Sequence, residues 1–250
     1  MNLLRLITFR QQQAASPVPL NGLVLYLDAA NPTSYPGSGT TWFDLSGNGY
    51  NATLINSPTF SGNSFLFEQS TNTYAQLTGS TINNQFGSNE ITVFSTINHV
   101  TTTIKPSICA FGNVDGTSYN YGFFAAGTRF LPRYQIFWSS GSSWRVGTNS
   151  TWTNSIWYGF AHTISGTTLN MYYNQQQAAY VANGTNGSGG GGSPTGPITT
   201  FAPTANGALR IGNANGGDEY TRGNMGALLI YKRVLNAGEL NQVFNYFARP

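Results

Sequence analysis

The first strong structural signal in the sequence is Gly22-Leu-Val-Leu-Tyr-Leu-Asp-Ala-Ala-Asn-Pro-Thr-Ser-Tyr-Pro-Gly-Ser-Gly-Thr-Thr-Trp-Phe-Asp-Leu-Ser-Gly-Asn-Gly-Tyr-Asn51. It opens with the apolar run Leu23–Leu27, which predicts a buried β-strand, and continues through glycine, proline, asparagine and serine, which are typical of turns. Short apolar runs separated by turn residues recur along the rest of the chain. They predict further strands over residues 64–67, 74–77, 91–97, 121–126, 133–138, 143–146, 158–164, 168–174, 208–211 and 225–231.

One α-helix is predicted, near the C-terminal end of the sequence. Asn236 can cap it, and Glu239 stands three residues later, as in a capping box. The apolar residues that follow have the spacing of one helix face, so the helix is expected to lie on a sheet: Leu240, Val243, Phe244 and Phe247. Many short strands with a single helix predict an all-β sandwich or barrel.

The chain is predicted to form one domain, residues 21–250, preceded by an arm. Residues 1–20 join an apolar segment to a polar, proline-ended linker, and are interpreted as an N-terminal docking arm, with a frayed terminus as the alternative. Arg5 and Arg10 interrupt the apolar segment, which argues against a signal peptide. Residues 184–197 are rich in glycine and serine, but the part after them is too short to bury its own core. This segment is therefore predicted to be a flexible loop inside the domain.

The composition argues against several classes of partner. Charged residues make up 8% of the chain and the net charge is +3, with no run of basic residues that would follow successive phosphates of a nucleic acid. A local group of arginines is interpreted as the wet face of a hairpin, with an anionic glycan or partner contact as the alternative: Arg129, Arg133 and Arg145. No stretch is apolar enough to cross a bilayer. Cys109 is the only cysteine, which excludes an intramolecular disulfide.

Three blocks of the sequence resemble laminin-G-like domains of the concanavalin A-like lectin family: Gly22–Asn51, Ile156–Asn174 and Leu209–Leu240. Their order and spacing fit from about residue 21 onward. The resemblance implies a jelly-roll sandwich of two antiparallel sheets. It also implies a binding function, often for glycans and sometimes through calcium. The opening block is especially similar to versions found in structural proteins of tailed phages.

The sequence lacks the residue patterns of hydrolases that share this architecture. Sandwich glucanases place their carboxylates as Glu-x-Asp-x-x-Glu on one strand, whereas Asp218 and Glu219 are adjacent and would point to opposite faces of a strand. No Gly-x-Ser-x-Gly nucleophile elbow occurs. His99 and His162 lack metal-ligand spacing, and the resemblance makes His162 a strand residue. The chain is therefore predicted to be non-enzymatic.

The segment Asp-Leu-Ser-Gly-Asn-Gly, which begins at Asp44, offers side-chain oxygens at alternate positions. Hard cations bind such oxygens, so a calcium site at Asp44 and Asn48, with Ser46 between them, is one interpretation. A tight turn is the preferred one, because Asp and Asn side chains accept hydrogen bonds from nearby backbone and glycines take positive φ. No other cofactor is expected.

Sugar binding needs an exposed aromatic face with amide or hydroxyl groups nearby. The candidates are aromatic residues in loop-like surroundings rich in Asn, Ser and Thr, although each could equally pack on the edge of the sandwich: Tyr35, Tyr119, Trp144 and Trp152.

The leading functional hypothesis is a virion surface protein of a tailed phage, as a capsid decoration, cement or fibre subunit. It would stabilise the particle or adhere to host-surface glycans through many repeated contacts. Docking on another virion protein, such as a capsid or tail protein, is assigned to residues of the arm: Leu3, Leu4, Arg5, Ile7, Phe9 and Arg10. A homotrimer is expected by analogy alone, and neither nucleic acid nor membrane insertion is expected. The alternatives are a free or cell-surface lectin and, less favoured, a glycoside hydrolase.

Overall fold

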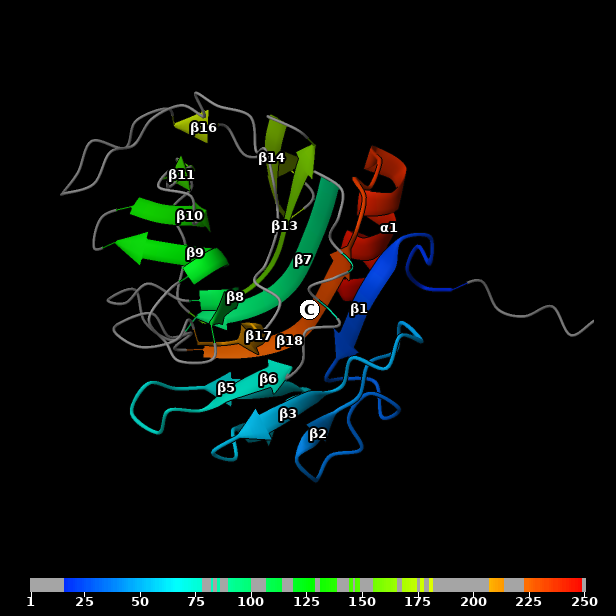
Figure 1. Cartoon of the computed structure of the whole chain (residues 1–250), viewed down its shortest axis with the longest axis vertical. Coiled ribbons are helices and arrows are strands. Elements are labelled where there is room, and N and C mark those ends of the chain that lie inside the picture. Colours follow the sequence, from blue (N-terminus) through cyan, green and yellow to red (C-terminus); the bar gives the residue numbers. More distant parts are fainter. Residues whose placement is uncertain are drawn as a thin grey trace, which may run out of the picture.

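The computed structural model describes residues 16–77, 82, 85, 90–99, 107–113, 119–128, 131–138, 144–145, 147–148, 155–165, 168–174, 176–177, 180–181, 207–213 and 223–248. These residues form two large antiparallel β-sheets, a small two-stranded sheet and one helix. The predicted sandwich of two antiparallel sheets with a short C-terminal helix is therefore confirmed. Figure 1 shows the two large sheets as layers, with α1 on the outer side of one of them.

The sheet next to α1 is called the helix-side sheet. Its strand order is β15-β14-β13-β7-β18-β5-β4, and β1 also pairs with β18. Its members are β1 (Leu23–Asp28), β4 (Thr59–Ser61), β5 (Ser64–Phe67), β7 (Glu90–His99), β13 (Trp157–Ser165), β14 (Thr168–Tyr173), β15 (Gln176–Gln177) and β18 (Gly223–Tyr231).

The second sheet has the order β11-β10-β9-β8-β17-β6-β3-β2. Its members are β2 (Thr41–Trp42), β3 (Ala52–Ile55), β6 (Tyr74–Leu77), β8 (Ser107–Asn113), β9 (Tyr119–Thr128), β10 (Leu131–Trp138), β11 (Trp144–Arg145) and β17 (Gly207–Ile211). The small sheet pairs β12 (Gly147–Thr148) with β16 (Tyr180–Val181).

Both faces of the helix-side sheet are apolar. On β7, Val93 and Ile97 belong to the core between the sheets, whereas Phe94 belongs to a second cluster between this sheet and α1. Successive side chains of a strand point to opposite faces, so one strand serves both clusters. This explains why β18 reads as a continuous apolar run over Ala227–Tyr231 instead of an alternating one.

Helix α1 (Ala237–Phe247) begins at the predicted cap. Asn236 Oδ1 accepts a hydrogen bond from the Glu239 N–H at 3.0 Å, and Glu239 Oε2 accepts one from the Asn236 N–H at 2.9 Å. The predicted apolar stripe is buried, and the rings of Phe244 and Phe247 lie 5.1 and 5.3 Å from that of Phe94 on β7. Within the described ranges, no helix has the length and apolar character that a membrane span requires.

Arg233 ties the N-terminal end of α1 to the chain before β1. Its guanidinium donates to both carboxylate oxygens of Glu239, at 2.6 and 2.8 Å, and its Nε donates to the Asn21 carbonyl at 2.7 Å. The hydrogen bonds from Arg233 hold the pKa of the Glu239 carboxyl below its usual value. Gly22 has φ +73°, and a Cβ atom there would lie 3.0 Å from the Arg233 side chain. A side chain at position 22 would therefore push Arg233 away from its hydrogen-bond partners Glu239 and Asn21.

The linker before β1 packs on the domain. Val18 is buried in the cluster between the helix-side sheet and α1, and the Ser16 carbonyl accepts a hydrogen bond from Gln242 Nε2 at 3.1 Å. Val18, two residues after the first described residue, thus already contributes to the core three residues before the predicted domain start at residue 21. Residues 1–15 of the predicted arm and the predicted loop 184–197 lie outside the described residues.

Candidate functional site

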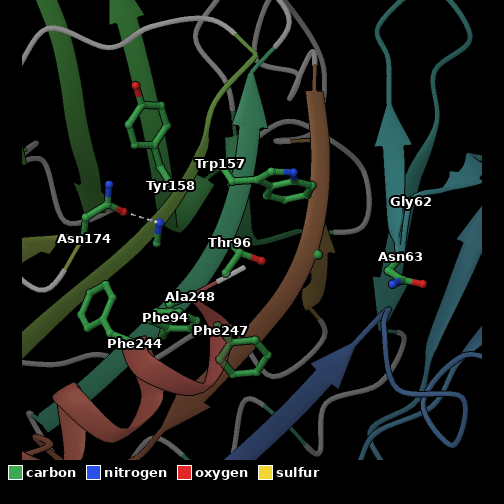
Figure 2. Close-up of a pocket in the computed structure, with 12 residues that line it drawn as sticks. Gly62, Asn63, Phe94, Thr96, Trp157, Tyr158, Asn174, Phe244, Phe247 and Ala248 are labelled. Carbon is green, nitrogen blue, oxygen red and sulfur yellow. Dashed lines mark hydrogen bonds between the residues drawn. The ribbon is translucent and has the colours of Figure 1, made fainter. Parts of the chain in front are cut away.

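A pocket of about 500 Å³ opens on the outer face of the helix-side sheet. Strands β7, β13 and β18 form its floor, the C-terminal end of α1 forms one side, and the turn between β4 and β5 contributes Gly62 and Asn63 (Figure 2). The volume lies within the range of small-molecule sites in proteins. The pocket thus collects side chains from segments that are far apart in the sequence.

A glycine keeps the floor of the pocket open. Gly226 stands at the irregularity in β18 where the register with β7 shifts between Met225 and Ala227. A Cβ atom at this position would lie 2.8 Å from Thr96 Oγ1 and 3.5 Å from the Trp157 ring. An alanine here would therefore collide with the Thr96 hydroxyl, and the side chains over Gly226 would have to shift.

Trp157 and Thr96 present an aromatic ring and a hydroxyl on the same face of the sheet. Trp157 begins β13 and is partly exposed, and Thr96 on β7 is the register partner of Gly159, two residues further along β13. Residues two apart on a strand share a face, so Trp157, Gly159 and Thr96 all lie toward the pocket. Figure 2 shows the indole extending from β13 toward β18.

Two asparagines supply neutral amides to the rim. Asn174 Oδ1 accepts a hydrogen bond from the Gly159 N–H at 2.9 Å, which leaves the amide nitrogen as a donor. Asn63 follows Gly62 in the two-residue turn that joins β4 to β5, and both have positive φ, as such hairpin turns require. The rim therefore offers hydrogen-bonding groups without formal charge.

The end of α1 closes the pocket with apolar surface. Phe244 and Phe247 line it together with Phe94. Gly159 allows the helix to come this close, because a Cβ atom there would lie 3.0 Å from the Phe244 ring. The site therefore combines an apolar wall, a partly exposed indole and neutral polar groups.

The described lining of the pocket carries no formal charge. None of its described residues is an aspartate, glutamate, histidine, lysine or arginine. Across the described part of the chain, no group of three or more His, Cys, Asp and Glu side chains is placed to hold a metal ion. The polar groups that the described side chains offer in the pocket are therefore neutral amides, hydroxyl groups and an indole N–H.

Tyr35 does not offer an exposed face for a sugar. Its ring is 6% exposed and lies edge-on to Phe60 and Phe65, with centroids 4.8 and 4.7 Å apart. The phenol donates to the Gly39 carbonyl at 3.1 Å. The assignment of Tyr35 to a binding surface was therefore wrong, because core aromatic side chains cover its ring.

The carboxylate of Asp44 is used within the protein. Oδ1 accepts hydrogen bonds from the N–H groups of Tyr26 and Ser46, both at 2.9 Å. Oδ2 accepts from the Ser46 hydroxyl at 2.7 Å and from the Tyr50 N–H at 3.0 Å. These are the contacts of the tight-turn interpretation of this segment, and they point four donors at the oxygens that a cation would need.

The same loop covers the free edge of β1. The Val24 carbonyl accepts from the Asn48 amide at 3.0 Å, and the Tyr26 carbonyl accepts from the Leu45 N–H at 2.8 Å. The side chain of Asn48 therefore points its amide nitrogen, a hydrogen-bond donor, toward β1. The Asp-Leu-Ser-Gly-Asn-Gly segment therefore completes the hydrogen bonding of a strand that has only β18 as a sheet neighbour.

His162 is a strand residue of β13, as the sequence resemblance implied. Its side chain is fully buried, and burial lowers the pKa of the imidazole well below its usual value. The backbone of Tyr119 and Trp144 lies in β9 and β11. Predicted site residues that fall outside the described parts are Trp152, the side chains of Tyr119 and Trp144, and Leu3, Leu4, Arg5, Ile7, Phe9 and Arg10.

None of the pocket residues was singled out in the sequence as a site residue, although Phe244 and Phe247 were predicted on the apolar face of the helix. One signal was present: Gly226 interrupts an apolar strand, which often marks a bulge or a close approach of another group. Trp157 stands directly before the predicted strand 158–164. Nothing in the sequence places Trp157, Gly226 and the end of α1 side by side, because they belong to separate segments.

Comparison with known proteins establishes similarity of fold. No family model and no curated protein sequence matches the chain. Trypanosoma rangeli sialidase in complex with sialic acid has a TM-score of 0.61 and 16% identity over 91% of this chain, which spans only 33% of the sialidase. Domain 4 of AbnA, a GH43 extracellular arabinanase from Geobacillus stearothermophilus, in complex with arabinotriose, has a TM-score of 0.58 and 16% identity over 90% of this chain and 97% of that domain.

A third similar structure is the binding domain of botulinum neurotoxin serotype D/C, with a TM-score of 0.59 and 12% identity over 90% of this chain and 52% of that one. At these identities the likeness concerns the fold alone. The chain therefore has a β-sandwich fold of two antiparallel sheets, which it shares with these domains.

Proposed function

We propose that this chain is a non-catalytic carbohydrate-binding module, and that its sugar site is the pocket beside the C-terminal end of α1. The observation that carries the proposal is the pairing of a partly exposed indole, Trp157, with the neutral polar side chains of Thr96, Asn63 and Asn174. Sugars combine apolar ring faces with hydroxyl groups, so an aromatic ring beside amides and a hydroxyl matches them.

The similar structures support a binding role more than a catalytic one. The arabinanase domain that matches over nearly its whole length is described in complex with arabinotriose, and the toxin domain is described as a binding domain. The sialidase is an enzyme, but this chain spans a third of it. The pocket also lacks the carboxylate pair that glycoside hydrolysis uses, among the described residues that line it.

Trp157→Ala is expected to weaken sugar binding at least about tenfold, because truncating an aromatic anchor that the bound sugar covers removes most of the contact area in such a site. A glycan array with the full chain identifies a bound sugar, and calorimetry with that sugar compares the variants. Trp157→Phe should retain part of the affinity, since a ring remains.

Phe43→Ala is the matched control, because Phe43 is an aromatic side chain that is 42% exposed and does not line the pocket. It should bind like the unmodified chain. The proposal would be contradicted if the chain bound no glycan on the array. It would also be contradicted if Trp157→Ala, shown to be folded by circular dichroism, bound the sugar as tightly as the unmodified chain.

A place on the surface of a tailed-phage particle is a second proposal. It is favoured by the resemblance of Gly22–Asn51 to phage structural proteins and by the low charged fraction of 8%. In that setting the module would be held by the arm predicted over residues 1–20 and would act as a trimer with many copies on one particle. Gold-labelled antibody against the chain should decorate intact particles in electron micrographs. Label confined to the unassembled protein fraction would reject this role.

A further inference from the structure

We infer that the pocket takes an uncharged sugar and discriminates against sialic acids and uronic acids. This inference rests on the carbohydrate-binding function proposed above and concerns the chemical class of the ligand. The inference predicts that this chain does not bind sialic acid, the anionic sugar with which the sialidase is described; the fold of this chain matches a third of that sialidase.

The first argument is the absence of a cation in the described lining of the pocket. A sugar carboxylate loses water when it enters a pocket, and this loss is compensated only by a charged partner or several hydrogen-bond donors. Arginine is the usual partner because its planar guanidinium binds both carboxylate oxygens. Thr96, Asn63 and Asn174 supply only neutral groups.

Two arginines of the described residues, Arg233 and Arg210, contact groups away from the pocket. Arg233 binds Glu239 and the Asn21 carbonyl at the N-terminal end of α1, whereas the pocket lies at the opposite end of that helix. The guanidinium of Arg210 on β17 lies 4.8 Å from the centre of the Tyr74 ring, in the second sheet. Neither one lines the pocket.

The second argument is the direction of α1. Phe247 is the last residue of the helix and Ala248 its C-cap, and both line the pocket. The C-terminal end of a helix carries partial negative charge and carbonyl groups without partners inside the helix. No basic residue stands in the last turn to offset this charge. Hydroxyl groups can donate to such carbonyls, whereas a carboxylate is repelled by them.

The third argument is the shape of the floor. Thr96 and Trp157 lie close over Gly226, because a Cβ atom there would be 2.8 Å from Thr96 Oγ1 and 3.5 Å from the Trp157 ring. A sugar ring bound against the partly exposed indole would contact it with apolar carbons, and a hydroxyl of that sugar would hydrogen-bond to the neighbouring Thr96. This pairing uses the two chemical features of a neutral sugar, and the described lining adds no charged partner for a carboxylate.

The test is calorimetry and saturation-transfer NMR on the full chain with matched probes. The neutral probes are arabinotriose, maltotriose, cellotriose and lactose, and the anionic probes are trigalacturonate and 3′-sialyllactose. At least one neutral probe should bind, and it should bind at least about tenfold tighter than any anionic probe. Raising the salt concentration should leave its affinity unchanged, because no ion pair is screened.

Three variants locate and define the interaction. Thr96→Val keeps the shape of the side chain and removes its hydroxyl, and should weaken binding about five- to tenfold. Gly226→Ala should abolish detectable binding by displacing Thr96, whose hydroxyl would lie 2.8 Å from the added Cβ atom. Arg249 follows Ala248 in the sequence and is the cation nearest in sequence to the helix end, so Arg249→Gln tests for a hidden charged partner and should have no effect. Thermal melts confirm that each variant is folded, and Thr96→Val alone suffices if Gly226→Ala does not fold.

The outcomes separate the inference from the proposed function. Preferred binding of an anionic probe, or a loss of affinity in Arg249→Gln, overturns the uncharged-sugar inference and leaves the carbohydrate-binding function standing. Binding of a neutral probe that Thr96→Val and Gly226→Ala do not weaken places the sugar outside this pocket, and overturns the inference as well. Failure of every probe and of a full glycan array overturns the proposed function itself.

Discussion

Asp44→Ala is expected to lower the free energy of unfolding by about 3 kcal/mol, because several partly buried donors lose their acceptor at once. The carboxylate accepts hydrogen bonds from Tyr26, Ser46 and Tyr50, and so joins β1 to the loop that follows β2. Urea denaturation monitored by tryptophan fluorescence measures the change. The free energy of unfolding of Asp44→Asn should lie between those of the unmodified chain and of Asp44→Ala. Its amide oxygen can replace Oδ1 as an acceptor, but its amide nitrogen would face the donors that now bind Oδ2.

Calcium serves as the control for this prediction. If hydrogen-bond donors already occupy the Asp44 carboxylate, calcium should have no effect on stability. The unmodified chain should then melt at the same temperature in EDTA as in millimolar calcium, and so should Asp44→Ala at its own lower temperature. A cation that binds only the folded state raises its stability. A calcium-dependent rise in the melting temperature that disappears in Asp44→Ala would contradict the turn interpretation and restore the metal site at Asp44 and Asn48.

His162 is expected to make the protein less stable as the pH falls from 7 to 5. Burial lowers the pKa of its imidazole in the folded state, so the unfolded chain takes up a proton more readily than the folded one. The contribution of neutral His162 to the free energy of unfolding is therefore fully present above the ordinary histidine pKa of about 6.5. Below that pH the free energy of unfolding falls by up to about 1.4 kcal/mol per pH unit. The expected loss at pH 5 is about 2 kcal/mol by this slope.

His162→Met should flatten this dependence, because methionine fills a similar volume and does not titrate. The chain contains one other histidine, so His99→Gln is the matched control and should keep the slope. Chemical denaturation at a series of pH values compares the three proteins. The effect of the Glu239 carboxyl does not interfere, since its lowered pKa confines it to more acidic solutions. A slope that survives in His162→Met would show that another group titrates.

The strands and the helix could be predicted where the pattern was local. The run Ser64–Phe67 was predicted with its observed bounds, and the helix cap at Asn236 was visible as a capping box. Short strands such as Ala52–Ile55 were missed, because Ala-Thr-Leu-Ile contains only two large apolar residues, whereas Ser64–Phe67 contains three in succession. Their strand geometry comes from pairing with β6, which lies about twenty residues later in the sequence.

The candidate site was harder to predict, because its parts meet only in the folded chain. Tyr35 has the loop-like surroundings of an exposed aromatic residue, yet Phe60 and Phe65 cover it from strands further along the chain. Trp157 is the opposite case, because it begins an apolar strand and is nevertheless partly exposed. It is exposed because α1 ends before it covers this part of the sheet. Neither outcome follows from neighbouring residues in the sequence.

The covered edge of β1 also bears on how molecules of this protein meet one another. A strand with open amide and carbonyl groups can recruit a strand from another chain and start fibrous aggregation. With charged residues at only 8%, electrostatic repulsion offers little protection when many copies crowd together. Asp44 accepts a hydrogen bond from β1, and Leu45 and Asn48 donate to it. These contacts block that route, because they occupy backbone groups of β1 with which a strand of a neighbouring copy would pair.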